Sequence, residues 1–149
     1  MILLDTNVVS EPMRPKPDRN VLAWLDAQVA ETLYLSTVSL AELLLGIDSL
    51  PTGKRRKALA AALAEKVVAL FGERIVPFDL AAAQTYAKIV TRARRHGHPI
   101  AVADAQIAAI AASRQSSVAT RDEAPFQAAD VPVINPWTAT LEARIGGVD

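Results

Sequence analysis

The sequence predicts an α/β fold in which a central, mostly parallel sheet of about five strands carries helices on both faces. Short apolar runs alternate with longer stretches of helical periodicity from one end of the chain to the other. Strands that are joined by helices pair in parallel and are covered on both sides, which gives a three-layer α/β/α arrangement. The length of 149 residues is that of one ordinary domain, and no linker or repeat divides it.

The elements follow one another in a regular order. The apolar runs that are typical of strands are 2–4, 33–35, 75–78, 117–120 and 131–134. The helical patterns between them cover about 18–29, 38–47, 54–70, 79–96 and 104–114. Asp18 and Asp79 are expected to cap the helices that follow them, and Gly97 to end the helix before it. Pro12, Pro15 and Pro17 predict a loop after the first strand.

The long helix predicted over 54–70 rests on its apolar spacing. Leu59, Leu63, Val67 and Leu70 recur at intervals that place them on one side of a helix. The whole of 1–137 is expected to form a single domain, with 138–149 as a C-terminal tail.

Composition narrows the classes of function. The chain has no cysteine, so disulfides, zinc–thiolate sites and thiol nucleophiles are excluded. Sixteen basic and sixteen acidic residues give a formal net charge of zero, so any contact with nucleic acid must be local or must use a metal ion. The acid in the first five residues argues against a secretory signal, and a cytoplasmic protein without membrane association is expected. The positive mean hydropathy of +0.20 indicates a partner that covers apolar surface.

Four acidic residues are predicted at the same edge of the sheet. Asp5 and Asp122 come directly after predicted strands, whereas Glu42 and Asp104 lie near the start of predicted helices. Each of them has an ordinary structural explanation as a turn or capping residue, and Glu42 has the spacing of a capping box with Ser39. Their shared placement is more informative, because ligands of parallel sheets bind beyond the carboxyl ends of the strands.

Carboxylates gathered in this way predict a metal site. Two of them at about 5 Å repel each other by roughly 3 kcal/mol at an effective dielectric near 20. Proteins relieve this repulsion by raising a pKa or by binding a cation. A set of oxygen ligands without Cys or nearby His suits Mg²⁺, or Mn²⁺, better than zinc. Such an ion can activate a water and stabilise a leaving alkoxide, so the pattern predicts phosphodiester hydrolysis. Asp79, His96 and His98 are expected to lie outside this site.

Five motifs in order resemble those of the PIN-domain ribonucleases, and within them the VapC- and FitB-like toxins of bacterial toxin–antitoxin pairs. They are ILLDTNVVSEP at 2–12, LSTVSLAELLLG at 35–46, ADAQIA at 103–108, VATRD at 118–122 and VINPW at 133–137. The resemblance covers nearly the whole chain and implies a PIN-like fold. It also implies that the metal-binding and catalytic acids are Asp5, Glu42, Asp104 and Asp122, with Asn7 and Thr120 supporting them by hydrogen bonds.

The chain departs from the family pattern at the fourth acid. Many family members have Asn after the Thr-Arg pair and an Asp three positions later. Here Asp122 takes the place of that Asn, and Pro125 stands where the later Asp would be. Glu123 is therefore an alternative to Asp122 as the fourth carboxylate.

The resemblance also implies partners. Such toxins form homodimers, cleave RNA with Mg²⁺ and are held inactive by an antitoxin with a DNA-binding domain. The predicted helices 38–47 and 54–70 are candidates for an apolar groove that receives the antitoxin. The alternative function is a catalytically weak PIN module that mainly binds its antitoxin and contributes to autoregulation on DNA.

Overall fold

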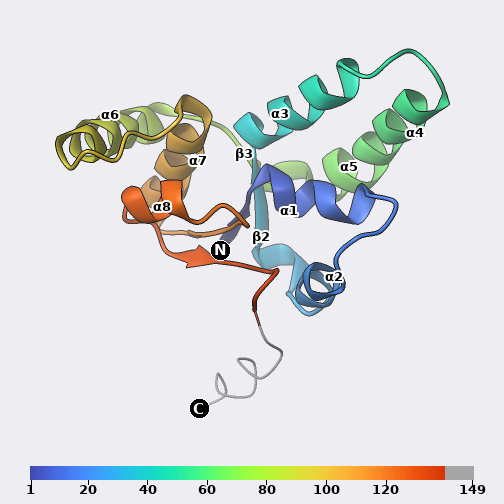
Figure 1. Cartoon of the computed structure of the whole chain (residues 1–149), viewed down its shortest axis with the longest axis horizontal. Helices are drawn as coiled ribbons and strands as arrows, with labels where there is room; N and C mark the ends of the chain where they lie inside the picture. Colours follow the sequence, from blue (N-terminus) through green and yellow to red (C-terminus); the bar gives the residue numbers. More distant parts are fainter. Residues whose placement is uncertain (140–149) are drawn as a thin grey trace.

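The structure, a computed structural model, describes residues 1–139 and shows a central sheet between two layers of helices (Figure 1). The strands are β1 (Ile2–Leu4), β2 (Leu33–Ser36), β3 (Ile75–Val76), β4 (Ser117–Ala119) and β5 (Val133–Ile134). The helices are α1 (Thr6–Ser10), α2 (Arg19–Asp26), α3 (Thr37–Asp48), α4 (Lys54–Leu63), α5 (Ala69–Phe71), α6 (Leu80–Arg95), α7 (Val102–Ser113) and α8 (Ala124–Ala128). The predicted fold class is confirmed, and each predicted strand is present.

The order of the strands locates a place for a ligand. The sheet runs β3-β2-β1-β4-β5, and all its strand pairs are parallel. The chain starts on the central strand, moves outward through β2 and β3, and then crosses to the other side of β1. The order therefore reverses between β1 and β4, and ligands of parallel sheets bind beyond the strand ends at such a reversal. Leu4 pairs with Ala119, so Asp5 and Thr120 are neighbours just past this edge.

Alternating side chains of the sheet supply two hydrophobic cores. Leu3 and Val118 belong to the core beneath α6, α7 and α8, whereas Leu4 and Ala119 belong to the core beneath α1 to α5. Successive residues of a strand point to opposite faces, so each short strand serves both cores. Figure 1 shows the same division, with α6, α7 and α8 on one side of the strands.

The sequence did not predict a helix directly after β1. A loop was expected after the first strand, but α1 begins at Thr6 and continues to Ser10. A helix of five residues is too short to be stable by itself. It is held because Val8 and Val9 are buried in the core and because the Asp5 side chain accepts a hydrogen bond from the Thr6 N–H.

The long helix predicted over 54–70 is interrupted. A π-helical turn at Ala64–Val68 separates α4 from α5. Each π-turn adds a residue to the helical repeat and so rotates the following residues about the axis. Leu63 and Val67 are buried, but Leu70 is 63% exposed and Phe71 is buried in its place. The regular helical spacing that grouped Leu70 with Leu63 and Val67 is therefore interrupted in the structure.

Several local predictions are confirmed. Asp18 accepts hydrogen bonds from the N–H groups of Asn20 and Val21 at the start of α2, and Asp79 accepts one from Ala82 at the start of α6. Gly97, with a φ of 73°, follows the end of α6. Among residues 1–139, no helix has the length and apolar character needed to cross a membrane. The predicted tail lies almost entirely outside the described residues.

Candidate active site

Asp5 is the most constrained acid of the predicted site. It follows β1, its backbone N–H donates to the Ala119 carbonyl at 2.9 Å, and only 6% of the residue is exposed. One carboxylate oxygen, Oδ1, accepts a hydrogen bond from the Thr6 N–H at 2.8 Å. The other, Oδ2, accepts one from the Thr120 hydroxyl at 2.8 Å. Both oxygens are thus oriented by hydrogen bonds, one from the segment after β1 and the other from the segment after β4.

The Thr120 hydroxyl connects the loop after β4 to α1. Besides donating to Asp5, it accepts hydrogen bonds from the Asp122 N–H at 3.0 Å and from the Asn7 Nδ2 at 3.4 Å. The Asn7 Oδ1 in turn accepts a hydrogen bond from the Arg121 N–H at 3.3 Å. One donated and two accepted bonds use the full capacity of a hydroxyl group. The supporting positions predicted for Asn7 and Thr120 therefore correspond to hydrogen bonds in the structure.

Glu42 reaches the same edge from α3. Its Oε1 accepts a hydrogen bond from the hydroxyl of Thr6 at 3.3 Å. The capping-box interpretation of Glu42 was wrong, because the cap of α3 is Ser36, whose hydroxyl oxygen accepts from the Ser39 N–H at 2.9 Å. Sequence reasoning did not single out Thr6. Its place directly after Asp5 was the available signal.

Asp104 lies in the first turn of α7, which begins two residues earlier than predicted. Burial of its carboxyl group raises its pKa, and the negative charges of Asp5 and Asp122 raise it further. The position of this acid near a helix N-terminus is compatible with the helix dipole. Its electrostatic coupling to acids that follow β1 and β4 places it within the same cluster.

The pKa values of Asp5 and Glu42 are also raised. For Asp5, burial has the largest effect and outweighs the hydrogen bonds from Thr120 and Thr6, which lower the pKa; the charge of Asp122 adds to the increase. Glu42 is exposed as a residue, yet partial burial of its carboxyl group is the largest cause of its raised pKa, followed by the charge of Asp5. The site thus penalises negative charge, and a bound cation would relieve this penalty.

The residues that are present fit an oxygen-preferring cation. Within the described part of the chain, no three His, Cys, Asp or Glu side chains are close enough to form a complete set of metal ligands. Mg²⁺ usually keeps several water ligands and is bound through one or two carboxylates, so a complete protein cage is not needed. The Ser39 hydroxyl, buried one helical turn before Glu42, has no hydrogen-bond partner among residues 1–139.

The other acids near strand ends are engaged elsewhere. Glu123, the alternative fourth acid, accepts a hydrogen bond from the Asn135 Nδ2 at 3.1 Å. Asp122 is the one that raises the pKa values of Asp5 and Asp104, which favours it over Glu123. Asp79 caps α6 and lies 3.6 Å from the Arg114 Nη2. The ring nitrogen Nδ1 of His96 lies 2.8 Å from the Arg92 carbonyl, so the predicted exclusion of His96 is consistent with its contacts.

Comparisons with known proteins agree with this arrangement. The sequence profile of the PIN domain matches residues 2–132. The chain is 50% identical over 137 residues to "Toxin FitB" of Neisseria gonorrhoeae (strain ATCC 700825 / FA 1090), covering 92% of this chain and 99% of that protein. It is 48% identical over 137 residues to "VapC ribonuclease Y4jK" of Sinorhizobium fredii (strain NBRC 101917 / NGR234), covering 92% and 98%.

A solved structure extends the likeness to three dimensions. The structure of FitAB bound to an IR36 DNA fragment contains a chain that is 48% identical to this one and superimposes with a TM-score of 0.90, covering 94% of this chain and 98% of that chain. The fold, the order of the motifs and the acids at the β1–β4 edge are thus accompanied by extensive sequence identity. The chain belongs to the PIN-domain family.

Proposed function

We propose that the protein is an Mg²⁺-dependent endoribonuclease, acting as the toxin of a toxin–antitoxin pair. The observation that carries the proposal is the coupled set of acids at the β1–β4 edge, in which Asp5, Glu42 and Asp104 all have raised pKa values. The relatives named as a toxin and as a VapC ribonuclease support the same reading. Mn²⁺ is expected to replace Mg²⁺, because both prefer oxygen ligands.

In this proposal the carboxylates of Asp5 and Asp104 hold the ion, with Glu42 and Asp122 completing its surroundings. When bound, the ion would polarise the phosphodiester and lower the pKa of a water molecule. Asp5 cannot rotate freely, because Thr6 and Thr120 each hold one of its oxygens. Glu42 lies on a helix, exposed and with a raised pKa, which suits a carboxylate that accepts the proton of the attacking water at Oε1 or Oε2.

An apolar groove supports the proposed antitoxin partner. A cavity of about 600 Å³ lies between α2, α4 and α5, and its lining includes Leu25, Leu59 and the exposed Leu70. An amphipathic segment of the antitoxin could bury this surface, which would explain the apolar composition of the chain. Helices α3 and α4 were both predicted to line such a groove. Helix α4 lines this cavity, and α3 lines an adjoining cavity of about 780 Å³ together with α4. A homodimer and a cytoplasmic location remain predictions.

The alternative function is a catalytically weak PIN module that binds its antitoxin and contributes to autoregulation on DNA. The likeness to a FitAB complex bound to DNA favours this role. One chain can perform both functions. Whether its nuclease activity is strong or weak depends on the acidic residues at the β1–β4 edge. A module without catalysis has no need to keep four acids at one edge of a sheet.

Nuclease activity with and without metal tests the proposal. The full chain, purified free of its antitoxin, should cleave single-stranded RNA in Mg²⁺ or Mn²⁺ and stop when EDTA is added. Isothermal calorimetry should detect uptake of Mn²⁺ by the wild type and weaker uptake by Asp104→Asn. Activity that persists in EDTA, or in Asp104→Asn at the wild-type rate, would contradict the proposed site.

A further inference from the structure

A second cavity adjoins the acidic cluster and also borders the proposed antitoxin groove, with which it shares Met13, Ala58 and Leu59. It measures about 780 Å³ and lies between α1, α3 and the start of α4. Thr6 and Glu42, which belong to the acidic site, form part of its wall, and Leu43 and Ile47 form part of its apolar lining. The same cavity is lined by two arginines, Arg14 and Arg55, from segments far apart in the sequence.

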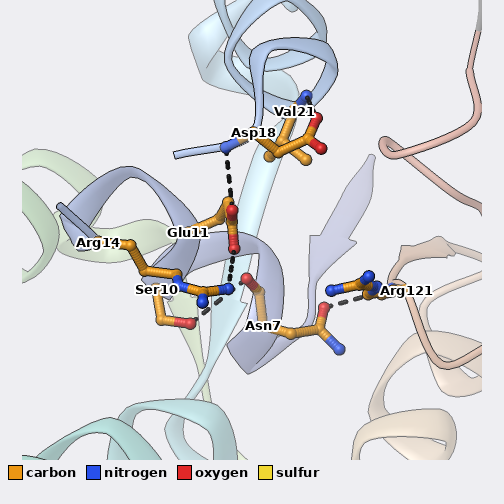
Figure 2. Close-up of polar contacts among 7 residues, drawn as sticks. All are labelled: Asn7, Ser10, Glu11, Arg14, Asp18, Val21 and Arg121. Atoms are coloured by element: carbon orange, nitrogen blue, oxygen red, sulfur yellow. Dashed lines mark hydrogen bonds and ion pairs between the residues drawn. The ribbon is translucent and has the colours of Figure 1, made fainter. Parts of the chain in front are cut away.

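Arg14 is oriented by a buried carboxylate. Its Nη1 lies 3.4 Å from the Glu11 Oε2, and Glu11 is only 5% exposed. The other oxygen of Glu11 accepts a hydrogen bond from the Asp18 N–H at 3.0 Å, so this carboxylate is itself fixed. Figure 2 shows Glu11 between the Asp18 backbone and the Arg14 guanidinium. The Arg14 side chain is still 62% exposed and has N–H donors free for a ligand.

Arg55 has no partner of this kind. It lies in the first turn of α4, where its neighbour Arg56 contacts the Asp48 Oδ1 at 3.6 Å. Within residues 1–139, the Arg55 side chain makes no ion pair or hydrogen bond. Cations in the first turn of a helix oppose its dipole, so helix formation does not explain a basic residue at this place. An unpaired guanidinium on the wall of a cavity is suited to an anion.

The charge distribution indicates which anion the cavity receives. The cluster around Asp5 and Glu42 repels a polyanion, and the chain has no net positive charge to offset this repulsion. A substrate with several phosphates therefore needs cations beside the acids. Arg14 and Arg55 meet this need, since their cavity includes Glu42 itself. By contrast, Arg92 is paired with Asp130 at 3.2 Å and lines other cavities.

We propose that the cavity between α1, α3 and α4 holds the RNA backbone beside the cleaved bond, with Arg14 and Arg55 contacting its phosphates. The proposal rests on the ribonuclease function proposed above and assigns a substrate-binding surface to it. The apolar lining provides a surface for the sugar or base of the same nucleotide. Both arginines bind substrate in this scheme and take no part in proton transfer.

Salt-dependent RNA binding tests the two contacts. A fluorescein-labelled single-stranded oligoribonucleotide is titrated with the full chain, in Mg²⁺ and in an Asp104→Asn background that prevents cleavage, at several salt concentrations. Each phosphate contact contributes about 0.7 to the slope of log K against log salt for single strands. Arg14→Ala and Arg55→Ala should each reduce the slope by about 0.7, and the double variant by about 1.4. Arg56→Ala, one residue from Arg55 and outside the cavity, should leave it unchanged.

Two further measurements separate a contact from a folding defect. Arg14→Lys keeps the charge and should retain the slope, whereas Arg14→Ala should not. In cleavage assays with otherwise wild-type protein, Arg14→Ala and Arg55→Ala should raise KM several-fold with little change in kcat, because the contacts bind ground state and transition state alike. Arg56→Ala should change neither quantity.

The outcomes distinguish this proposal from the ribonuclease proposal. If the wild type cleaves RNA but Arg14→Ala and Arg55→Ala keep the slope and KM of Arg56→Ala, the cavity is not the RNA path and its arginines are left for a protein partner. If the slopes fall as expected but the wild type cleaves nothing, the phosphate contacts stand and the ribonuclease proposal fails. If the wild type does not bind the oligoribonucleotide, both are overturned.

Discussion

The carboxyl ends of β1 and β3 carry similar residues with different consequences. Asp5 and Asp79 each follow a parallel strand closely, and each accepts a hydrogen bond from a backbone N–H of the helix that it caps. Asp5 lies on the central strand, beside the reversal of strand order, and is buried among other acids. Asp79 lies past the outermost strand, exposed and paired with Arg114. The same local motif therefore becomes a candidate catalytic group only where the sheet brings further acids to it.

The largest expected effect comes from exchanging each aspartate for asparagine. Asp5→Asn should reduce RNA cleavage by roughly 10²-fold or more, because it removes a charge that the proposed metal needs. Asp79→Asn should leave cleavage within about twofold, since Asn caps helices as well as Asp does. Initial rates with saturating Mg²⁺ measure both. Equal losses in the two variants would show that the position in the sheet does not matter.

Removal of the Thr120 hydroxyl should have the next largest effect. Thr120→Val keeps the side-chain size but deprives the buried Oδ2 of Asp5 of its hydrogen bond. The pKa of Asp5 should rise further, and the free energy of unfolding should fall by about 1–3 kcal/mol. The acidic limb of the pH–rate profile should move to higher pH, which a change in packing alone would not cause. Thr91→Val, at an exposed helical site, is the control.

Asp122 and Glu123 offer a comparison between adjacent acids. Asp122→Asn should lower cleavage by about tenfold, whereas Glu123→Gln should change it by less than about twofold, because only the charge of Asp122 couples to the cluster. Steady-state kinetics with one RNA substrate measures the difference. A larger loss in Glu123→Gln would assign the fourth carboxylate to Glu123.

The smallest expected effect is on thermal stability. A carboxyl group whose pKa is raised in the folded state stabilises the fold below its ordinary pKa, and this contribution is lost as the pH rises through the raised value. Without metal, Asp104→Asn should therefore have a Tm equal to or above that of the wild type near pH 7, by a few degrees at most. Mg²⁺ should raise the Tm of the wild type more than that of the variant. A lower Tm of the variant at neutral pH would contradict the raised pKa.

Local sequence signals predicted those parts of the molecule that depend on neighbouring residues. Asp18 and Asp79 were predicted as caps because the capping hydrogen bond reaches only two or three residues along the chain. Helix α1 was missed because its stability comes from burying Val8 and Val9, not from its own length. The exposure of Leu70 was missed because apolar spacing does not reveal the π-helical turn of five residues at Ala64–Val68.

The candidate site also has features that the sequence predicted and features that it did not. The motifs around Asp5, Glu42, Asp104 and Asp122 named the acids, and the order of strands and helices indicated one edge of the sheet. The Thr6–Glu42 bond and the shared cavity of Arg14 and Arg55 join segments that meet only in the folded chain, so the sequence did not place these residues together.

The sequence alone determined the α/β class, the strand positions, several caps and the identity of the acids, because these follow from side-chain periodicity, short-range hydrogen bonds and motif residues. Only the tertiary structure decided which acids share one electrostatic environment, how Thr120 orients Asp5, and which arginines face the acidic edge. The physical reason is that burial and Coulomb interactions depend on distances through space. Strand order sets those distances, and no local stretch of sequence encodes it.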